Sequence, residues 1–345
     1  MSENVRNRIE WVDCAKGFAI ILVVYGHALT YFSPNFDSIV HVVYSFHMPL
    51  FFALTGYVSA YSYNSVDFCA FYKKKNNALM KPYFLYGTLL LIFKSLRNYF
   101  SGNVIGSGNI NCIINTILIT RKSFISELWF LPCLLVAHCL MFFVAKRKTV
   151  YSWVIVSLCF GLALLFRMAY NIALPCNLDN ALLALPFIFG GIQWRISTKD
   201  KKRNFNIIIS ITALVIFVCV NFVEITHGYS VDYFADIIIG NVLLFFFTAT
   251  TGTIVIFECS QFVTECKSGF AKKGLLKCGR NTLSIYGLHY VVLAVVYQIL
   301  KRFRSEALGG QLILIIIETG IVIALILLSK ELLTNWKKYR GEIKQ

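Results

Sequence analysis

Two histidines near the start of the chain are spaced so that they could act together inside a membrane. Lys16 and His27 are eleven residues apart, about three turns of an α-helix, so their side chains are expected on one helix face. His27 lies ten residues before Asp37, and His47 lies ten residues after it. If the chain turns near Asp37, two antiparallel helices would bring both imidazoles to a similar depth. The sequence therefore predicts a catalytic pair, His27 and His47, with a cation on the same helix face.

Ionisable groups inside a membrane are energetically costly, so each is a candidate functional residue. Three other histidines, His41, His138 and His227, stand alone and are interpreted as packing residues with a single hydrogen bond each. A haem or metal ion between His27 and His47 is an alternative. The sequence offers no further ligands at a supporting spacing, so no metal site is expected.

The composition favours a membrane protein over a soluble one. The chain is 57% hydrophobic and 14% charged, whereas soluble domains are about 25% charged. Its net charge of +16 comes from short basic clusters between apolar runs. Such clusters are typical of cytoplasmic loops, so nucleic acid is not an expected partner. The eleven cysteines form no C-x-x-C pair and indicate neither a zinc site nor a disulfide framework.

Ten apolar runs are long enough, or nearly so, to cross a bilayer. The predicted spans cover residues 17–35, 38–61, 80–96, 128–145, 149–168, 180–194, 206–223, 234–257, 281–300 and 310–332. The third and sixth are short and lie between charges. Residues 98–120 are rich in Gly, Asn and Ser, and are interpreted as a loop or interfacial segment.

These spans predict an all-α, polytopic membrane protein with both termini in the cytoplasm. With the N-terminus inside, most of the 33 Lys and Arg fall in cytoplasmic loops. We expect one integral-membrane domain over residues 1–345, with a cytoplasmic N-terminal segment, 1–16, and a cytoplasmic tail, 334–345. The lipid bilayer is thus the first expected partner.

The order of the motifs resembles the membrane acyltransferase 3 family over nearly the whole chain. In that family a basic residue in the first helix is followed by ten residues and then by His. The matching segments here are Lys16 to His27, Phe46 to Tyr57, Leu128 to Pro132, Leu185 to Gly191, and Gly279 to Tyr286 with His289.

The resemblance implies an O-acyltransferase of a cell membrane. It would move an acetyl or short acyl group from cytoplasmic acetyl-CoA to a hydroxyl of a surface polysaccharide or lipid-linked sugar. Acetyl-CoA would be a co-substrate, and no permanently bound cofactor is expected. His27 matches the catalytic histidine, and Lys16 matches the basic residue, which is Arg in many members. An extracytoplasmic hydrolase-like domain, present in some members, is not expected here.

The chemistry of His27 follows from that reaction. A neutral imidazole could take the proton of the sugar hydroxyl as a general base. It could instead accept the acyl group and pass it on. The sequence leaves both routes open.

Other polar residues are assigned to the donor or the acceptor. Lys16, Lys73 and Lys74 could hold the phosphates of the donor, and Asp13 could pair with Lys16 at i,i+3. Glu127 and Trp129 could bind the acceptor sugar, or could sit in the aromatic belt of the membrane interface. Tyr57, Asn281 and His289 are assigned to acceptor binding or support by the resemblance. Glu318, in the middle of 310–332, is expected to form a structural ion pair.

Two other functions are compatible with a polytopic membrane protein. A glycan or lipid transporter or flippase would favour internal repeats and coupling charges at the midplane. A non-catalytic membrane assembly factor would not need a matched pair of histidines. Acyl transfer is the favoured interpretation.

Overall fold

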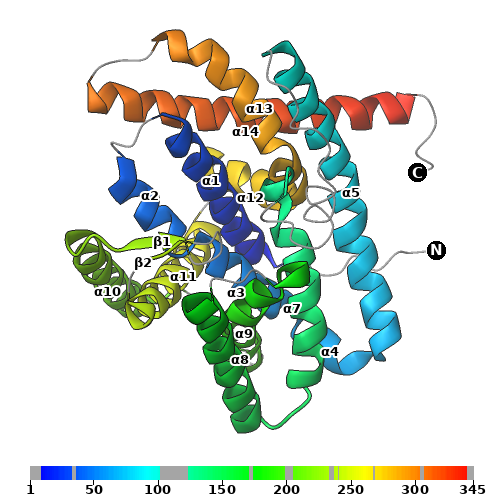
Figure 1. Cartoon of the computed structure of the whole chain (residues 1–345), viewed down its shortest axis with the longest axis vertical. Helices are drawn as coiled ribbons and strands as arrows, with labels where there is room; N and C mark the ends of the chain where they lie inside the picture. The colour runs from blue at the N-terminus through cyan, green and yellow to red at the C-terminus, as the bar shows by residue number, and fades with distance from the viewer. Residues whose placement is uncertain are drawn as a thin grey trace. The chain divides into compact units, whose positions relative to one another are not determined.

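The computed structural model describes most of the chain and resolves it into two compact units. The described residues are 9–32, 36–101, 123–170, 174–198, 205–232, 237–239, 241–266, 269–303 and 307–339. Unit 1 comprises Met1–Val43 and Ile256–Gln345, and unit 2 comprises Tyr44–Val255. Figure 1 shows that both are built almost entirely of helices.

Unit 1 is organised around its N-terminal helix. Helix α1 packs against three helices from the C-terminal part of the chain, and two of these, α13 and α14, also pack against each other. Their bounds are α1 Glu10–Phe32, α12 Phe270–Arg280, α13 Thr282–Leu300, η5 Lys301–Phe303 and α14 Leu308–Tyr339. Helices from the N-terminal and C-terminal parts of the sequence therefore pack together in one unit.

Two glycines let α1 and α12 approach closely. A Cβ atom on Gly17 would collide with the carbonyl oxygen of Leu275, and one on Gly279 would collide with that of Asp13. At each of these glycines the backbone of one helix lies against the backbone of the other. Small residues permit this packing between membrane helices. The sequence predicted a loop where α12 is found, because the eleven residues of this helix are too few and too basic for an apolar span.

Unit 2 is built around α9, whose middle is almost entirely buried. Helix α9 packs against α3, α7 and α8, and α5 packs against α7. Gly56 of α3 and Gly191 of α9 repeat the arrangement of unit 1, since a Cβ on either would collide with a backbone carbonyl of the other helix. The bounds are α3 His47–Ser59, α4 Ser62–Ser65, α5 Phe68–Phe100, η3 Ser126–Leu128, α7 Phe130–Val144, α8 Thr149–Tyr170, η4 Pro175–Asn177, α9 Leu178–Ser197 and α10 Ile207–Thr226.

The second predicted span, 38–61, is interrupted. Helix α2 runs from Asp37 to Tyr44 and α3 begins at His47. Pro49 explains the interruption, because proline has no N–H for the carbonyl four residues earlier, that of Ser45, and its ring clashes there. His47 consequently becomes the first residue of a new helix.

The eighth predicted span, 234–257, begins too early. A short antiparallel hairpin, β1 Ser230–Asp232 with β2 Ile237–Ile239, precedes α11, which covers Val242–Glu265. The side chain of Asn241 accepts the N–H of Leu243 at 2.9 Å and so caps the helix at this point. The hairpin is a small addition to an otherwise all-α protein.

Each of the ten predicted spans overlaps a helix. By length and composition, eight spans among the described residues could cross a membrane, which makes this a polytopic membrane protein. The two that do not qualify are the predicted third and sixth, which correspond to α5 and α9. Helix α5 is longer than predicted, since Asp67 caps it through the N–H of Ala70. Helix α9 carries Asp179 and Asn180, both fully buried within the protein.

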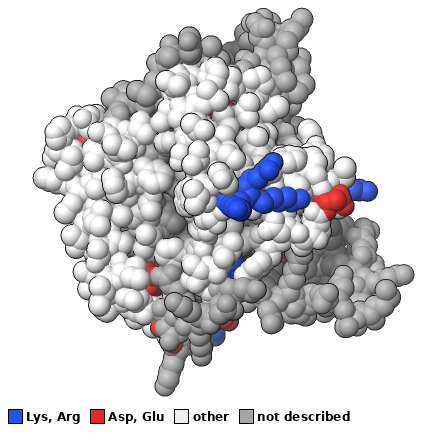
Figure 2. All heavy atoms as spheres, turned by 90° about the horizontal axis from the view of Figure 1, so that it is seen from below, with Lys and Arg blue, Asp and Glu red and all other residues white. Residues whose placement is uncertain are grey.

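The surface of several helices is apolar, as a lipid environment requires. Leu158 of α8 is 68% exposed and Ile208 of α10 is 74% exposed. Figure 2 shows a face that is mostly uncharged, with Lys, Arg, Asp and Glu confined to a few groups. Soluble proteins rarely expose apolar patches of this extent.

Candidate active site

His27 lies on α1 and packs against a second histidine of unit 1, His289. Its ring centre is 5.0 Å from that of His289 on α13, and the ring planes meet at 37°. His27 is half-buried, whereas His289 is only 1% exposed. Two imidazoles that are far apart in the sequence therefore lie next to each other in unit 1.

The hydrogen bonding of His289 fixes its tautomer. Its Nδ1 lies 2.7 Å from the carbonyl oxygen of Tyr286, which can only accept, so Nδ1 carries the proton. Nε2 of the neutral ring is then the basic nitrogen. One helical turn beyond His27, Tyr31 packs against Tyr290 and Tyr297 of α13. The contact between α1 and α13 is thus made of imidazole and phenol rings.

The N-terminal end of α1 receives cations from α12. Arg280 Nε lies 3.5 Å from Asp13 Oδ2, and Lys272 Nζ lies 3.4 Å from Glu10 Oε2. Lys16 is half-buried on the same helix. The predicted partner of Asp13 was Lys16, but its ion pair is with Arg280. Sequence reasoning missed Arg280 as a site residue, although it lies inside the segment that resembles the family.

Asn281 occupies the junction between α12 and α13. Its side-chain amide donates to the carbonyl oxygen of Lys277 at 2.7 Å, which satisfies a free carbonyl at the end of α12. Its own carbonyl accepts from Ser284 and Ile285 at the start of α13. Asn281 therefore joins the two helices that carry Arg280 and His289, and its role in supporting the site stays a prediction.

His47 is buried at the start of α3, in unit 2, and its ring packs edge-on against Tyr44 at 4.9 Å. A helix that begins inside a membrane protein after a break is typical of positions that line a binding cavity. His27 belongs to unit 1, so the matched depth of His27 and His47 stays a prediction.

Three consecutive lysines near the start of α5, of which Lys73 and Lys74 were predicted to bind the donor, differ in their surroundings. Lys73 and Lys74 are exposed. Lys75 instead turns inward, where its Nζ lies 2.7 Å from Ser59 Oγ and 3.1 Å from His138 Nε2. His138 was interpreted as a packing residue with one hydrogen bond, but its Nδ1 also lies 2.8 Å from the hydroxyl of Tyr63.

This buried cluster joins α3, α4, α5 and α7. Tyr63 is fully buried, and burial raises the pKa of its hydroxyl. Lys75 is the proton donor to His138 Nε2, so Nδ1 donates to the neutral Tyr63 oxygen. The cluster is a structural connection at the end of α3.

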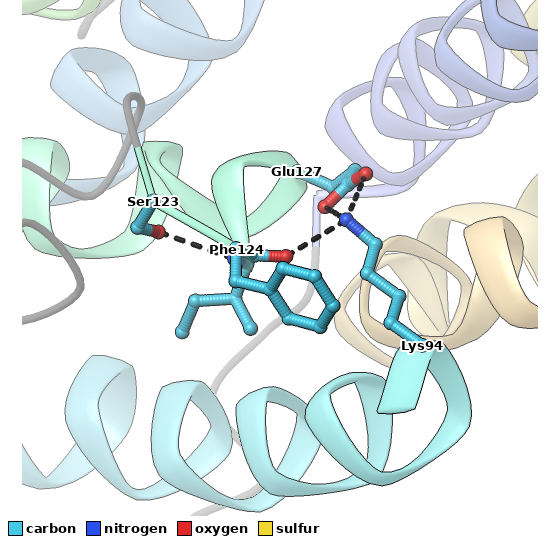
Figure 3. Close-up of polar contacts among 5 residues, drawn as sticks. Lys94, Ser123, Phe124 and Glu127 are labelled. Atoms are coloured by element: carbon cyan, nitrogen blue, oxygen red, sulfur yellow. Dashed lines mark hydrogen bonds and ion pairs between the residues drawn. The ribbon is translucent and has the colours of Figure 1, made fainter. Parts of the chain in front are cut away.

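Glu127 forms an ion pair that the sequence did not predict (Figure 3). Lys94 of α5 donates to both carboxylate oxygens, at 2.7 and 2.9 Å, and to the carbonyl oxygen of Phe124 at 2.8 Å. The side chains of Lys94 and Glu127 are 10% and 11% exposed. This pair fastens the segment before α7 to the end of α5, and it holds Glu127 in one position.

Removing one partner of this pair should destabilise the protein more than removing both. Lys94→Met leaves Glu127 buried without its cation, which costs about 3–5 kcal/mol of unfolding free energy for a buried pair. The double variant, with Lys94→Met and Glu127→Met, should recover most of that loss. Unfolding in detergent micelles, titrated with denaturing detergent, measures both. Equal unfolding free energies of the single and the double variant would contradict this prediction.

Trp129 and Tyr57 are both held by polar neighbours. The carbonyl oxygen of Trp129 accepts from Asn177 Nδ2 at 3.1 Å, and its ring meets Phe130 edge-on. The hydroxyl of Tyr57 accepts from Arg195 Nη1 at 2.8 Å. Neither hydrogen bond was apparent from the sequence, because each joins residues that are far apart in the chain.

The expected ion pair of Glu318 is absent from the part of the chain that the structure describes. Glu318 is fully buried on α14, and neither of its carboxylate oxygens has a hydrogen-bond partner there. The expectation rested on the cost of a buried charge, and a protonated carboxyl avoids that cost without a cation.

Comparison with known proteins identifies the family of this chain. Residues 9–329 match the Acyltransferase domain of the acyltransferase 3 family. This chain belongs to that family. The matched region contains all of α1, α12 and α13, and with them His27, Arg280 and His289. The resemblance inferred from the order of the motifs is thereby confirmed.

Two curated relatives of this acyltransferase 3 family member are nodulation proteins. The nodulation protein NolL of Mesorhizobium japonicum is 25% identical over 228 residues, which are 61% of this chain and 56% of that protein. NolL of Sinorhizobium fredii is 27% identical over 174 residues, 48% of this chain and 44% of that protein. The chain thus spans about half the length of these relatives. No solved structure matches it.

Proposed function

We propose that this protein is a membrane O-acyltransferase that moves an acetyl or short acyl group from cytoplasmic acetyl-CoA to a sugar hydroxyl. The acceptor is a surface polysaccharide or a lipid-linked sugar, and the membrane is a cell membrane. The observation that carries the proposal is the contact of His27 with His289, inside the region that matches the acyltransferase domain.

In the proposed reaction His27 is the catalytic base. Its imidazole takes the proton of the acceptor hydroxyl while the hydroxyl oxygen attacks the thioester carbonyl. The carbon–sulfur bond breaks, and the leaving thiolate receives the proton from the imidazolium. In the alternative route the imidazole attacks the thioester first and carries the acyl group to the sugar. His289, whose tautomer is fixed by Tyr286, orients His27 and offers a second basic nitrogen beside it.

The donor is proposed to approach through the predicted cytoplasmic end of α1. Lys16 and Arg280 supply positive charge there, and Asp13 holds Arg280 in place. Lys73 and Lys74 are exposed at the start of α5 and are free to meet phosphate in solution. On the predicted opposite side, Glu127 and Trp129 are proposed to contact the acceptor sugar. Tyr57 and Asn281 are proposed to support the helices.

The experiment that tests this proposal uses membrane vesicles of known orientation. Inside-out vesicles from cells that express the protein, supplied with acetyl-CoA labelled in the acetyl group, should transfer label to the host glycan. Right-side-out vesicles should not, because acetyl-CoA does not reach the cytoplasmic face. If only right-side-out vesicles transferred label to the glycan, the predicted orientation would be wrong. Failure to label any glycan with acetyl-, succinyl- or other short acyl-CoA would favour a transporter instead.

A further inference from the structure

A cation at the end of α9 is held in an unusual way by two tyrosines of unit 2. Arg195 Nη1 donates to the hydroxyl of Tyr57 at 2.8 Å. The central guanidinium carbon lies 4.9 Å from the ring centre of Tyr57 and 5.7 Å from that of Tyr61. Tyr57 is 4% exposed, whereas Arg195 is half-buried. We call Arg195, Tyr57 and Tyr61 the arginine clamp.

The clamp fixes the guanidinium without neutralising it. Aromatic faces attract a cation through the ring quadrupole, and a phenol oxygen accepts only one of its five N–H groups. Within the described ranges, no carboxylate forms an ion pair with Arg195. Its remaining N–H groups can therefore bind an anion, and their planar arrangement matches two oxygens of a phosphate.

Two lysines of unit 2, one buried and one half-buried, are committed to protein groups. Lys94 binds Glu127 in a buried pair, and Lys75 binds Ser59 and His138. A cation in the last turn of a helix interacts favourably with the helix dipole, and this explains why a charged residue occupies position 195. The dipole does not explain why two tyrosines hold the guanidinium of Arg195. The clamp adds pre-organisation, which reduces the entropy lost when a ligand binds.

We propose that the arginine clamp binds a phosphate group at the nucleotide end of the acyl donor. This inference rests on the proposed function, because it takes a CoA thioester as the donor. The end of α9 belongs to the predicted cytoplasmic side, where acyl-CoA is found. The sequence that follows contains Lys199, Lys201, Lys202 and Arg203, which lie outside the described residues and whose charge complements phosphate. Tyr57 and Tyr61 are positioning residues for Arg195.

Binding of CoA to the purified protein in lipid nanodiscs tests the clamp without any acceptor sugar. Arg195→Ala should weaken CoA binding about 10- to 100-fold, the factor expected when a charge-assisted contact is lost. Arg195→Lys keeps the charge but not the planar fork, and Tyr57→Phe keeps the ring but not the hydroxyl. Each should weaken binding about threefold. Adenosine, which has no phosphate, should bind wild type and Arg195→Ala equally.

Arg147→Ala is the matched control, because Arg147 is an exposed arginine of another predicted cytoplasmic loop. It should leave CoA affinity unchanged.

Melting temperatures without ligand separate a structural role from a binding role, and Arg195→Lys should melt close to the wild type. Equal CoA affinity of wild type and Arg195→Ala would overturn the clamp and leave the proposed donor standing. A wild type that binds no CoA would overturn the proposed donor and the clamp together.

Discussion

His27→Ala should reduce acyl transfer by roughly 10²- to 10⁴-fold, the range that a positioned general acid or base contributes. The substitution removes the only imidazole that α1 carries. The protein should remain folded, since His27 is half-buried and the close packing of α1 against α12 depends on Gly17 and Gly279 instead. Transfer of labelled acetyl groups to glycan, measured in membranes with equal amounts of each variant, checks this result.

Two further histidine variants sharpen the test. His227→Ala is the control, because His227 is exposed at the end of α10 and bonds only within its own helix and the turn that follows. It should transfer at the wild-type rate. His289→Ala should lose about 10- to 100-fold, since misplacing a catalytic group by about 1 Å can have an effect of this size. Wild-type transfer by His27→Ala would remove this residue from the mechanism.

Gly191→Ala should destabilise unit 2 by about 3 kcal/mol or more, although it adds a single methyl group. The new Cβ would collide with the carbonyl oxygen of Ala53 in α3, and backbone atoms cannot move aside as a flexible side chain can. Helices α3 and α9 would have to separate, which disrupts the most buried packing of the unit. The free energy of unfolding in micelles, titrated with denaturing detergent, measures the change.

The adjacent residue provides the control. A Cβ on Gly190 would meet no atom within 4 Å, so Gly190→Ala should raise helix stability slightly, by about 0.5–1 kcal/mol. Both variants make the same chemical change in the same helix. A similar stability for both would contradict the close approach of α3 and α9 at Gly191. If the packing also positions His47, Gly191→Ala should lose activity in proportion to its loss of fold.

Much of this protein can be predicted from its sequence. Apolar runs identify the membrane helices because a chain in lipid must satisfy its backbone hydrogen bonds within each segment. The span 38–61 was predicted without a break, although local sterics at Pro49 account for the break before His47. The order of the motifs indicates the acyltransferase 3 family and singles out His27. These features depend on residues close together in the chain.

The partners of the site residues were decided by the tertiary structure. His289 lies beside His27, Arg280 pairs with Asp13, Lys94 pairs with Glu127, and Arg195 is held by Tyr57. Each contact joins two helices, so it depends on how far each helix is rotated and shifted against its neighbour. Close approach at four glycines sets that relation between α1 and α12 and between α3 and α9. Apolar periodicity contains little information about it, because lipid-facing and protein-facing sides are both apolar. Sequence therefore determined which groups could do chemistry, and packing determined which of them meet.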